Sequence, residues 1–320
     1  MKLIIKMSIK TNIGNLKLES CIYNASGPRC TSIDELKAID NSDSSIVLSK
    51  SCTLEVREGN PKPRYFHNEY GSINSMGLPN KGYQYYLEHS NIINKPYFIS
   101  INGLTLDDTL IIFREVVNSN KVKGIEINLS CPNIIGKGQL AYDLEEMDKY
   151  LEKIFSQNLK IQKLVIGVKL PPYFDLHWYP LITNIIKKYP ISFITCINSV
   201  GNALIVDSNT ESVLIKPKGG MGGLGGLYVK PIGLSNVRNF YLEFQKQGLN
   251  IDIIGCGGIQ NGIDIFEYIL CGAKAVQIGT EFYREGCSVF TRLDKELKNY
   301  MNKKGYSKLD DFYGKLKILN

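Results

Sequence analysis

The sequence predicts a (β/α)8 barrel with an N-terminal β-hairpin, and two observations support this prediction. Short apolar runs alternate with longer segments of helical periodicity along nearly all of the 320 residues, as in repeated β-α units. Eight such units favour a closed barrel over the alternative, an open doubly wound sheet. No stretch has the composition of a linker, so we expect one domain over residues 1–320, a length that single barrels reach.

The expected elements follow in chain order. Residues 8–18 contain the turn signal Asn12-Ile13-Gly14-Asn15, which predicts a hairpin that closes the bottom of the barrel. The barrel strands are expected at 22–26, 45–50, 97–101, 124–129, 164–169, 192–198, 252–256 and 275–278. Helices are expected between them, for example at 105–118, 143–157, 178–188, 232–247 and 262–271.

Long loops are expected after the second, fourth and sixth strands. Residues 51–86 and 200–229 are too long for simple connections, which usually span about 2 to 6 residues in compact α/β units. All three loops leave the carboxyl ends of strands, the face on which barrel active sites are built. We therefore interpret them as lids and walls of a substrate site.

Composition narrows the class of protein. The 38 basic and 31 acidic residues give a net charge of +7, but the lysines are scattered, which does not favour a nucleic-acid footprint and suits small anionic substrates. The eight cysteines lack the spacing of a disulfide framework or a zinc site and indicate a reducing compartment; Cys52, Cys196, Cys256 and Cys271 are expected to be buried. Without a signal-peptide pattern or an apolar run of about 18 to 20 residues, a cytoplasmic location is expected.

A thiol stands between two amides directly after the fourth expected strand, in the run Asn128-Leu129-Ser130-Cys131-Pro132-Asn133. Pro132 has no N–H to donate to a ladder, so these side chains are expected on a loop, where they can face a ligand. A cysteine in such a place can act as a base when its thiolate is stabilised. On these six residues alone, a purely structural turn remains the alternative.

Three glycine-rich features occur late in the chain: Gly219-Gly220-Met221-Gly222-Gly223-Leu224-Gly225-Gly226, Gly255-Cys256-Gly257-Gly258 and Gly279-Thr280. The first has more glycine than packing alone is expected to require. The other two close the seventh and eighth strands, where barrels commonly bind phosphate through backbone N–H groups. They predict a phosphate-bearing cofactor, and the alternative is glycines that relieve strain in tight turns.

Lysines end two of the expected strands. Lys50 closes the second and Lys169 the fifth, so both ammonium groups are expected at the mouth of the barrel. A single lysine there could simply extend to solvent. Two lysines that converge with Cys131 on a cofactor site instead indicate a functional role.

Together these motifs closely resemble the dihydroorotate dehydrogenases, specifically the soluble, fumarate-using class 1A. The resemblance runs from about residue 20 to the end of the chain, through 24–27, 49–51, 57–64, 71–80, 128–133, 167–175, 198–199, 215–226, 255–259, 277–280 and 312–316. The membrane-associated class has serine in place of Cys131 and an extra N-terminal helix, which we do not expect here. The NAD-linked class 1B shares the cysteine but not this form of 57–64 and 71–80.

The resemblance implies FMN as cofactor and no metal. Its phosphate is expected at Gly257, Gly258, Gly279 and Thr280, and its ring and ribityl chain beside Ser26, Gly27, Lys50, Ser51, Asn128, Lys169, Ile197 and Gly226. Orotate or dihydroorotate is expected at Lys50, Asn74, Met76, Gly77, Leu78, Asn128, Asn133, Asn198 and Ser199. Asparagine amides suit the donors and acceptors of a pyrimidinedione, and a lysine suits its carboxylate.

The resemblance also implies the reaction, oxidation of (S)-dihydroorotate to orotate in pyrimidine biosynthesis. Cys131 would remove the C5 proton while C6 gives hydride to the flavin, Lys169 would stabilise the reduced flavin, and fumarate would then collect the hydride at the same site in a ping-pong cycle. A homodimer is implied in the same way. Three alternatives remain: a flavin barrel that reduces uncharged pyrimidines, a class 1B-like enzyme with another acceptor, and a non-redox phosphate-binding barrel. Lys50 and the 74–78 turn argue against the first.

Overall fold

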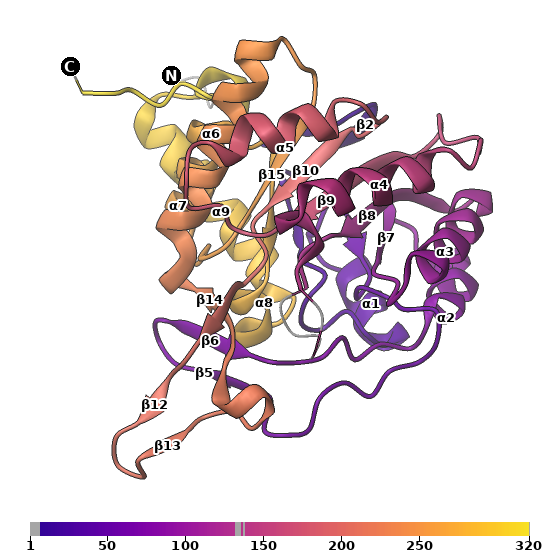
Figure 1. The fold of residues 1–320 in the computed structure, drawn as a ribbon. Helices are drawn as coiled ribbons and strands as arrows, with labels where there is room; N and C mark the ends of the chain where they lie inside the picture. The colour runs from indigo at the N-terminus through magenta and orange to yellow at the C-terminus, as the bar shows by residue number, and fades with distance from the viewer. Residues whose placement is uncertain (1–6, 132–135, 137, 320) are drawn as a thin grey trace.

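Eight parallel strands form the central sheet of the computed structural model, which describes residues 7–131, 136 and 138–319 (Figure 1). They are β3 (Ile22–Asn24), β4 (Val47–Leu48), β7 (Tyr97–Ile101), β8 (Val122–Asn128), β9 (Val165–Leu170), β10 (Phe193–Cys196), β15 (Asp252–Cys256) and β16 (Ala275–Ile278). The hydrogen-bonded order is β3-β16-β15-β10-β9-β8-β7-β4. Each strand begins and ends within two residues of its expected position, so the barrel prediction is confirmed.

The seam between β3 and β4 is closed largely by one side chain. Asn24 accepts a hydrogen bond from the backbone N–H of Leu48 at 2.9 Å and donates to the Leu48 carbonyl at 2.7 Å. A backbone bond from Ser45 N to the Ile22 carbonyl, 3.0 Å long, adds to this pairing. The buried amide of Asn24 therefore imitates a strand partner and brings the two end strands together.

Aromatic rings fill the part of the barrel interior that is farther from the carboxyl ends of the strands. Phe98 and Phe193 are buried, with ring centroids 6.1 Å apart. A Cβ at Gly124 would come within 2.5 Å of the Phe98 ring, and one at Gly167 within 2.4 Å of the Phe193 ring. Small residues on β8 and β9 thus make room for large ones on β7 and β10, as interdigitated packing requires.

Helices connect the strands and cover the outside of the barrel (Figure 1). They are α1 (Ile33–Asp40), α2 (Tyr83–Glu88), α3 (Leu106–Asn118), α4 (Leu144–Phe155), α5 (Trp178–Ile186), α6 (Lys230–Gln247), α7 (Gly262–Cys271), α8 (Thr280–Glu285) and α9 (Ser288–Lys304), with short 3-10 turns η1 (His89–Ile92), η2 (Leu140–Tyr142), η3 (Pro217–Gly220), η4 (Leu227–Val229) and η5 (Leu309–Asp311). Local sequence sets their ends: Thr105 and Asp108 form a capping box on α3, and α7 ends at Gly272 with a φ of 116°. Within the described residues, no helix is both long and apolar enough to cross a membrane.

The N-terminal hairpin lies at the end of the barrel where the strands begin, as expected. Strands β1 (Thr11–Ile13) and β2 (Leu16–Leu18) pair antiparallel, and Ile13 is fully buried. The N–H of Gly14 in the turn donates to the Asp252 carboxylate at 2.7 Å. Asp252 is the first residue of β15, so this bond ties the hairpin to the amino-terminal edge of the strands.

The two longest connections meet and form a second sheet, which the sequence analysis did not predict. Its order is β11 (Val200–Ala203), β14 (Gly222–Gly226), β6 (Gly71–Asn74) and β5 (Tyr65–His67). A Cβ at Gly226 would lie 2.3 Å from the Gly71 Cα, and one at Gly71 would lie 2.1 Å from the Gly225 carbonyl oxygen. Packing therefore accounts for part of the glycine run, because close contact between backbones requires glycine at Gly226, while a Cβ at Gly219 would meet nothing within 4 Å.

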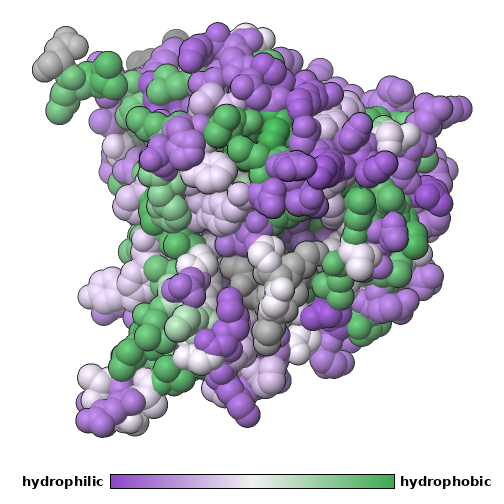
Figure 2. Space-filling model, viewed as in Figure 1, coloured by the Kyte–Doolittle hydropathy of each residue, from purple (hydrophilic) through white to green (hydrophobic). Residues whose placement is uncertain are grey.

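Beyond this sheet, β12 (Val206–Asp207) and β13 (Ser212–Val213) form a hairpin that projects away from the barrel (Figure 1). Figure 2 shows polar side chains over much of this face and an apolar patch toward the projecting arm. Its exposed apolar residues include Leu204, Val206 and Val213.

Candidate active site

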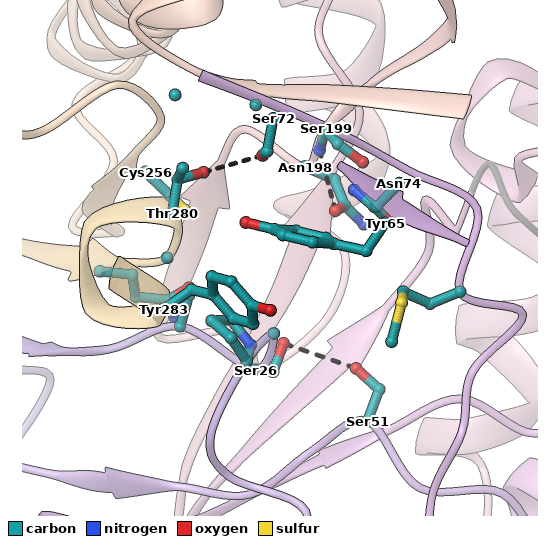
Figure 3. A pocket seen from close by; sticks show the side chains of 18 of the residues that line it. Ser26, Ser51, Tyr65, Ser72, Asn74, Asn198, Ser199, Cys256, Thr280 and Tyr283 are labelled. Carbon is teal, nitrogen blue, oxygen red and sulfur yellow. Dashed lines mark hydrogen bonds between the residues drawn. The ribbon is translucent and has the colours of Figure 1, made fainter. Parts of the chain in front are cut away.

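A cavity of about 1000 Å³ opens at the carboxyl ends of the barrel strands, beneath the second sheet (Figure 3). With one exception, the site residues expected from the sequence all line it; they are Ser26, Gly27, Lys50, Ser51, Asn74, Met76, Gly77, Leu78, Asn128, Cys131, Lys169, Ile197, Asn198, Ser199, Gly226, Gly257, Gly258, Gly279 and Thr280. The exception, Asn133, lies outside the described residues. Residues from both ends of the chain therefore converge on one cavity.

One end of the cavity is formed by glycines and hydroxyls. Gly257 and Gly258 have φ values of 130° and 72°, which side-chain-bearing residues rarely adopt. A Cβ at Gly258 would lie 2.5 Å from the Cβ of Lys230, so the turn also requires glycine for space. Across from it, the hydroxyls of Thr280 and Ser72 lie 3.1 Å apart (Figure 3). This end presents backbone and hydroxyl groups, which are suitable partners for phosphate oxygens.

Lys50 follows β4 and is only 8% exposed. Its Nζ donates to the carbonyl oxygens of Ser26 at 3.2 Å and Gly27 at 3.0 Å. Both acceptors are neutral, and burial lowers the pKa of the Lys50 ammonium below its usual value of 10.5. An anionic ligand in the cavity would restore the charge balance of this group.

Asparagine side chains form a hydrogen-bond network around the end of β8. Asn198 donates through Nδ2 to the carbonyl and hydroxyl of Ser130, both at 3.0 Å, and to Asn128 Oδ1 at 3.3 Å. Asn128 in turn donates to the Ser51 hydroxyl at 3.3 Å. Asn74, on β6 of the second sheet, donates to the Gly223 carbonyl at 3.1 Å. The cavity therefore holds oriented amides from three separate segments.

Cys131 lies three residues beyond the end of β8 and is partly exposed at the cavity. This agrees with the expected position of Cys131 on the loop after the fourth barrel strand. The four cysteines expected to be structural, Cys52, Cys196, Cys256 and Cys271, are all buried.

Lys169 lies near the end of β9 and is 4% exposed. Its Nζ donates to Gln277 Oε1 at 3.0 Å and lies 4.0 Å from the sulfur of Cys256. Burial tends to lower the pKa of Lys169, but neighbouring groups, Cys256 and Glu126 foremost, raise it above its usual value overall. Lys169 and Lys50 thus share a cavity, but the protein raises the pKa of Lys169 and lowers that of Lys50.

Several residues that line the cavity were not expected from the sequence, including Ser72, Tyr65, Tyr283 and Gln277. The rings of Tyr65 and Tyr283 lie beside each other in the cavity with centroids 4.4 Å apart (Figure 3). Tyr65 comes from the unexpected second sheet, so no local pattern could have indicated it. Gln277 is different, because it lies on a strand whose alternate residues face the barrel interior, and that periodicity would have identified it.

Basic residues outnumber acidic ones in the lining of the cavity within the described residues. The basic side chains are Arg29, Lys50, Lys62, Arg64 and Lys169, and the acidic ones are Glu35 and Glu281. Both acids are already engaged: Glu35 caps α1, and Glu281 pairs with Arg284 at 3.4 Å. The cavity therefore favours anionic ligands.

Comparison with known proteins agrees with this geometry. The family model described as dihydroorotate dehydrogenase matches residues 8–301. The chain belongs to the dihydroorotate dehydrogenase family. Enzymes of this family are oxidoreductases and generally depend on a flavin.

Relatives and solved structures support this membership in the dihydroorotate dehydrogenase family. A Streptococcus agalactiae relative is 47% identical over 318 residues, covering 98% of this chain and all of its own length. Dihydroorotate dehydrogenase A (fumarate) of Lactococcus lactis subsp. cremoris is 45% identical over 317 residues, covering 97% of this chain and 100% of the relative. The crystal structure of DHODH from Eimeria tenella in complex with ferulenol has a TM-score of 0.79 at 20% identity, covering 96% of this chain and 88% of that one. This last similarity shows the shared barrel fold.

Proposed function

We propose that this protein oxidises (S)-dihydroorotate to orotate, a step of pyrimidine biosynthesis, and reduces fumarate to succinate at the same site. The observation that supports this most is the convergence of Cys131, Lys50, Lys169 and the asparagine amides on one cavity with an excess of positive charge. Dihydroorotate, orotate, fumarate and succinate are all carboxylates, so one basic cavity can serve them in turn. The class named by the Lactococcus lactis relative agrees with fumarate as the acceptor.

The cavity fits FMN as the resident flavin. A Cβ at Gly279 would meet only the Ala25 Cβ at 3.8 Å, and a Cβ at Gly27 would meet nothing within 4 Å, so both glycines face open space. The Tyr65 hydroxyl is buried without a hydrogen-bond partner among the described residues, and it lines the same cavity. We propose that Gly257, Gly258, Gly279 and Thr280 hold the phosphate, and that the ring and ribityl chain lie beside Ser26, Gly27, Lys50, Ser51, Asn128, Lys169, Ile197 and Gly226.

The flavin, when bound, supplies hydride acceptance from dihydroorotate and hydride delivery to fumarate. The protein supplies orientation and proton transfer. Lys50 would bind the substrate carboxylate, assisted by backbone N–H groups of the 76–78 turn, while Asn74, Asn128 and Asn198 orient the pyrimidine ring, with Asn133 and Ser199 as further expected contacts. Cys131, as thiolate, would remove the proton from C5 and return one to the product of fumarate reduction. Lys169 would place a fixed positive charge beside the flavin ring.

The test of this function is a spectrum followed by an assay of the purified chain. A flavin absorption band, and release of FMN on denaturation, are expected. The chain should then couple dihydroorotate oxidation to fumarate without a partner, and orotate should compete directly with fumarate because both use one site. Negligible rates with fumarate beside high rates with NAD or a soluble quinone would reject the fumarate assignment. Turnover of uracil instead of orotate would indicate a reductase of uncharged pyrimidines. A colourless protein would indicate a non-redox barrel.

Cys131→Ala tests the proposed base. The variant should keep its flavin but reduce it with dihydroorotate about 100- to 10,000-fold more slowly, the usual contribution of a positioned base. Cys131→Ser should retain some activity, with its optimum at higher pH because an alcohol is a weaker acid than a thiol. Cys287→Ala, which changes a partly buried cysteine outside the cavity lining, is the matched control. A wild-type rate of flavin reduction in Cys131→Ala would show that another group is the base.

We further propose that the protein is a homodimer, as the family resemblance implies. The projecting hairpin supports this, since Leu204, Val206 and Val213 are 49%, 58% and 43% exposed on an arm that extends from the barrel. Light scattering after size-exclusion chromatography should give about twice the chain mass of 36.0 kDa. A monomeric mass at micromolar concentration would contradict the proposal.

A further inference from the structure

A polar layer lies inside the barrel, directly beneath the cavity and above the phenylalanine layer. Glu126 on β8 is fully buried, two residues before Asn128 and therefore on the same side of the strand. Thr195 on β10 and Gln277 on β16 face the same space, and both are buried. A carboxylate with no exposure inside a barrel is costly unless several donors satisfy it.

Three donors satisfy Glu126. Its carboxylate accepts from the Thr195 hydroxyl at 2.8 Å, from Gln277 Nε2 at 2.5 Å and from the Ser26 hydroxyl at 3.3 Å. Ser26 is itself a cavity residue and Thr195 precedes the strand end by one position, so the carboxylate is anchored from several strands. The proposed catalysis assigns no role to Glu126.

The amide of Gln277 connects Glu126 to Lys169. A carboxylate can only accept, so the amide must turn its NH₂ group toward Glu126, and this leaves its oxygen toward Lys169. Lys169 Nζ donates to that oxygen at 3.0 Å. The two hydrogen bonds run in one direction, from ammonium through amide to carboxylate, and such aligned bonds strengthen each other in a buried site.

We propose that Glu126 acts through Gln277 as a positioning residue that keeps Lys169 charged and correctly oriented in the cavity. The consequence for the flavin rests on the proposed function, but the relay itself concerns residues of this chain alone. Glu126 balances the buried ammonium, so the cofactor meets a cation that does not depend on a ligand for its charge.

Near pH 7, the other titratable groups around Lys169 do not provide this balance. They are Cys30, Cys196, Cys256, Tyr23 and Lys50. Burial raises the pKa of the Cys30 thiol to about 12, and it also raises the pKa values of Cys196, Cys256 and Tyr23, so these four groups are neutral near pH 7. Lys50 is a cation and opposes the charge on Lys169. Glu126 is the one carboxyl group in contact with this network among the groups named here.

The experiment follows the protonation of Lys169 directly in the protein purified with its flavin. The ε-¹³C resonance of Lys169, assigned by its loss in Lys169→Met, is titrated with pH by NMR. In Glu126→Gln, which keeps the shape and removes the charge, the midpoint should fall by at least one pH unit, about tenfold in proton affinity. The midpoint potential of the bound flavin, measured in parallel, should depend more steeply on pH over the range in which Lys169 then loses its proton.

A charge-swapped variant separates this role from a merely structural one. In Glu126→Gln combined with Gln277→Glu, the amide and the carboxylate exchange places, and the carboxylate accepts directly from Lys169. This variant should restore the Lys169 midpoint to the wild-type value or above. Asp40→Asn changes another buried carboxylate, at the end of α1, which accepts from the backbone of Asn94 and Lys95 and has no contact with Lys169 or Gln277 among the hydrogen bonds of the described residues; it is the matched control and should leave the Lys169 titration unchanged.

An unchanged Lys169 midpoint in folded Glu126→Gln, or a failure of the swap to restore it, would overturn the relay. If Glu126→Gln does not fold, Gln277→Met tests the relay instead: it keeps both charges but removes the amide between them, so the Lys169 midpoint should fall, and an unchanged midpoint would overturn the relay. These outcomes are distinct from failure of the proposed function. A shifted Lys169 midpoint in a protein that does not oxidise dihydroorotate would keep the relay and reject the reaction.

Discussion

Lys50 and Lys169 occupy two sides of one cavity, and the protein treats them in opposite ways. Both are almost fully buried, at 8% and 4% exposure. Lys50 donates to two neutral carbonyl oxygens, and its pKa is lowered. Lys169 lies beside the Cys256 sulfur and donates to an amide that bonds the Glu126 carboxylate, and its pKa is raised, by Cys256 and Glu126 foremost. Burial alone therefore does not decide whether a lysine keeps its charge; the partner group does.

This difference matches two kinds of ligand. The positive charge on Lys50 is balanced only when an anion enters, which suits substrates and products that exchange in every cycle. The positive charge on Lys169 is balanced by the protein itself, which suits a cofactor that stays bound through both half-reactions. The comparison can be tested by changing each lysine in the same way.

The largest expected effect is on stability. Lys169→Met leaves the Glu126 carboxylate buried without its counter-charge and should lower the free energy of unfolding by about 3 to 5 kcal/mol. Lys50→Met removes a desolvated cation and leaves no buried charge behind, so it should cost about 1 kcal/mol. Urea unfolding of both variants with excess flavin present measures the difference.

A double variant controls the interpretation of this stability loss. Adding Glu126→Gln to Lys169→Met removes the uncompensated charge and should recover part of the lost free energy, which a double-mutant cycle reports as coupling. Equal losses in the two single lysine variants, or no coupling in the cycle, would contradict the contrast between the two sites.

The second effect is on ligand binding. Lys50→Ala should weaken orotate binding about 10- to 100-fold, because a charge-assisted hydrogen bond contributes about 1.5 to 3 kcal/mol. The bound flavin should report this in a spectral titration. Lys62→Ala, which removes an exposed lysine from the same cavity lining, should change orotate affinity by less than about threefold because solvent screens its charge. Unaltered orotate and fumarate affinities in Lys50→Ala would reject its assignment as the carboxylate partner.

The smallest effect is a pH dependence. A lysine with a lowered pKa loses its proton at a lower pH than an exposed lysine, so as pH rises toward 10 the unliganded cavity should lose the Lys50 charge first. Orotate affinity should then decrease with rising pH while Lys169, whose pKa is raised, remains charged. Orotate titrations between pH 7 and pH 10, limited to the range in which the flavin stays bound, measure this. An affinity independent of pH, or one that decreases equally in Lys50→Ala, would contradict it.

Local patterns predicted most of the barrel. Strands at 97–101, 252–256 and 275–278 match β7, β15 and β16 in both bounds, because apolar runs and their flanking turn residues are encoded by neighbours in the chain. The site residues could be named because their motifs resemble a known family and because residues that end parallel strands meet at one edge. Lys50, Cys131 and Lys169 illustrate this, since each lies near or just beyond the end of a barrel strand and lines the cavity.

The second sheet could not be predicted in this way. Residues 71–74 and 222–226 are separated by about 150 positions, and their pairing depends on close backbone contact between glycines. Neither segment has a strand-like alternation of apolar and polar residues, so no local pattern indicates that the two segments pair. Tyr65 and Ser72 were missed as cavity residues for the same reason, since that sheet brings them over the barrel.

By itself, the sequence determined the barrel, the positions of its strands and the identity of the groups at their carboxyl ends, because periodicity and strand order follow from local chemistry. Only the tertiary structure decided how those groups are electrically paired. Lys50 and Lys169 look alike in the sequence, each at the end of an apolar run. Their difference arises from the groups around Lys169, Cys256 and Glu126 foremost, which are far from it in sequence but near it in the barrel interior, where a low dielectric strengthens their effect on its charge.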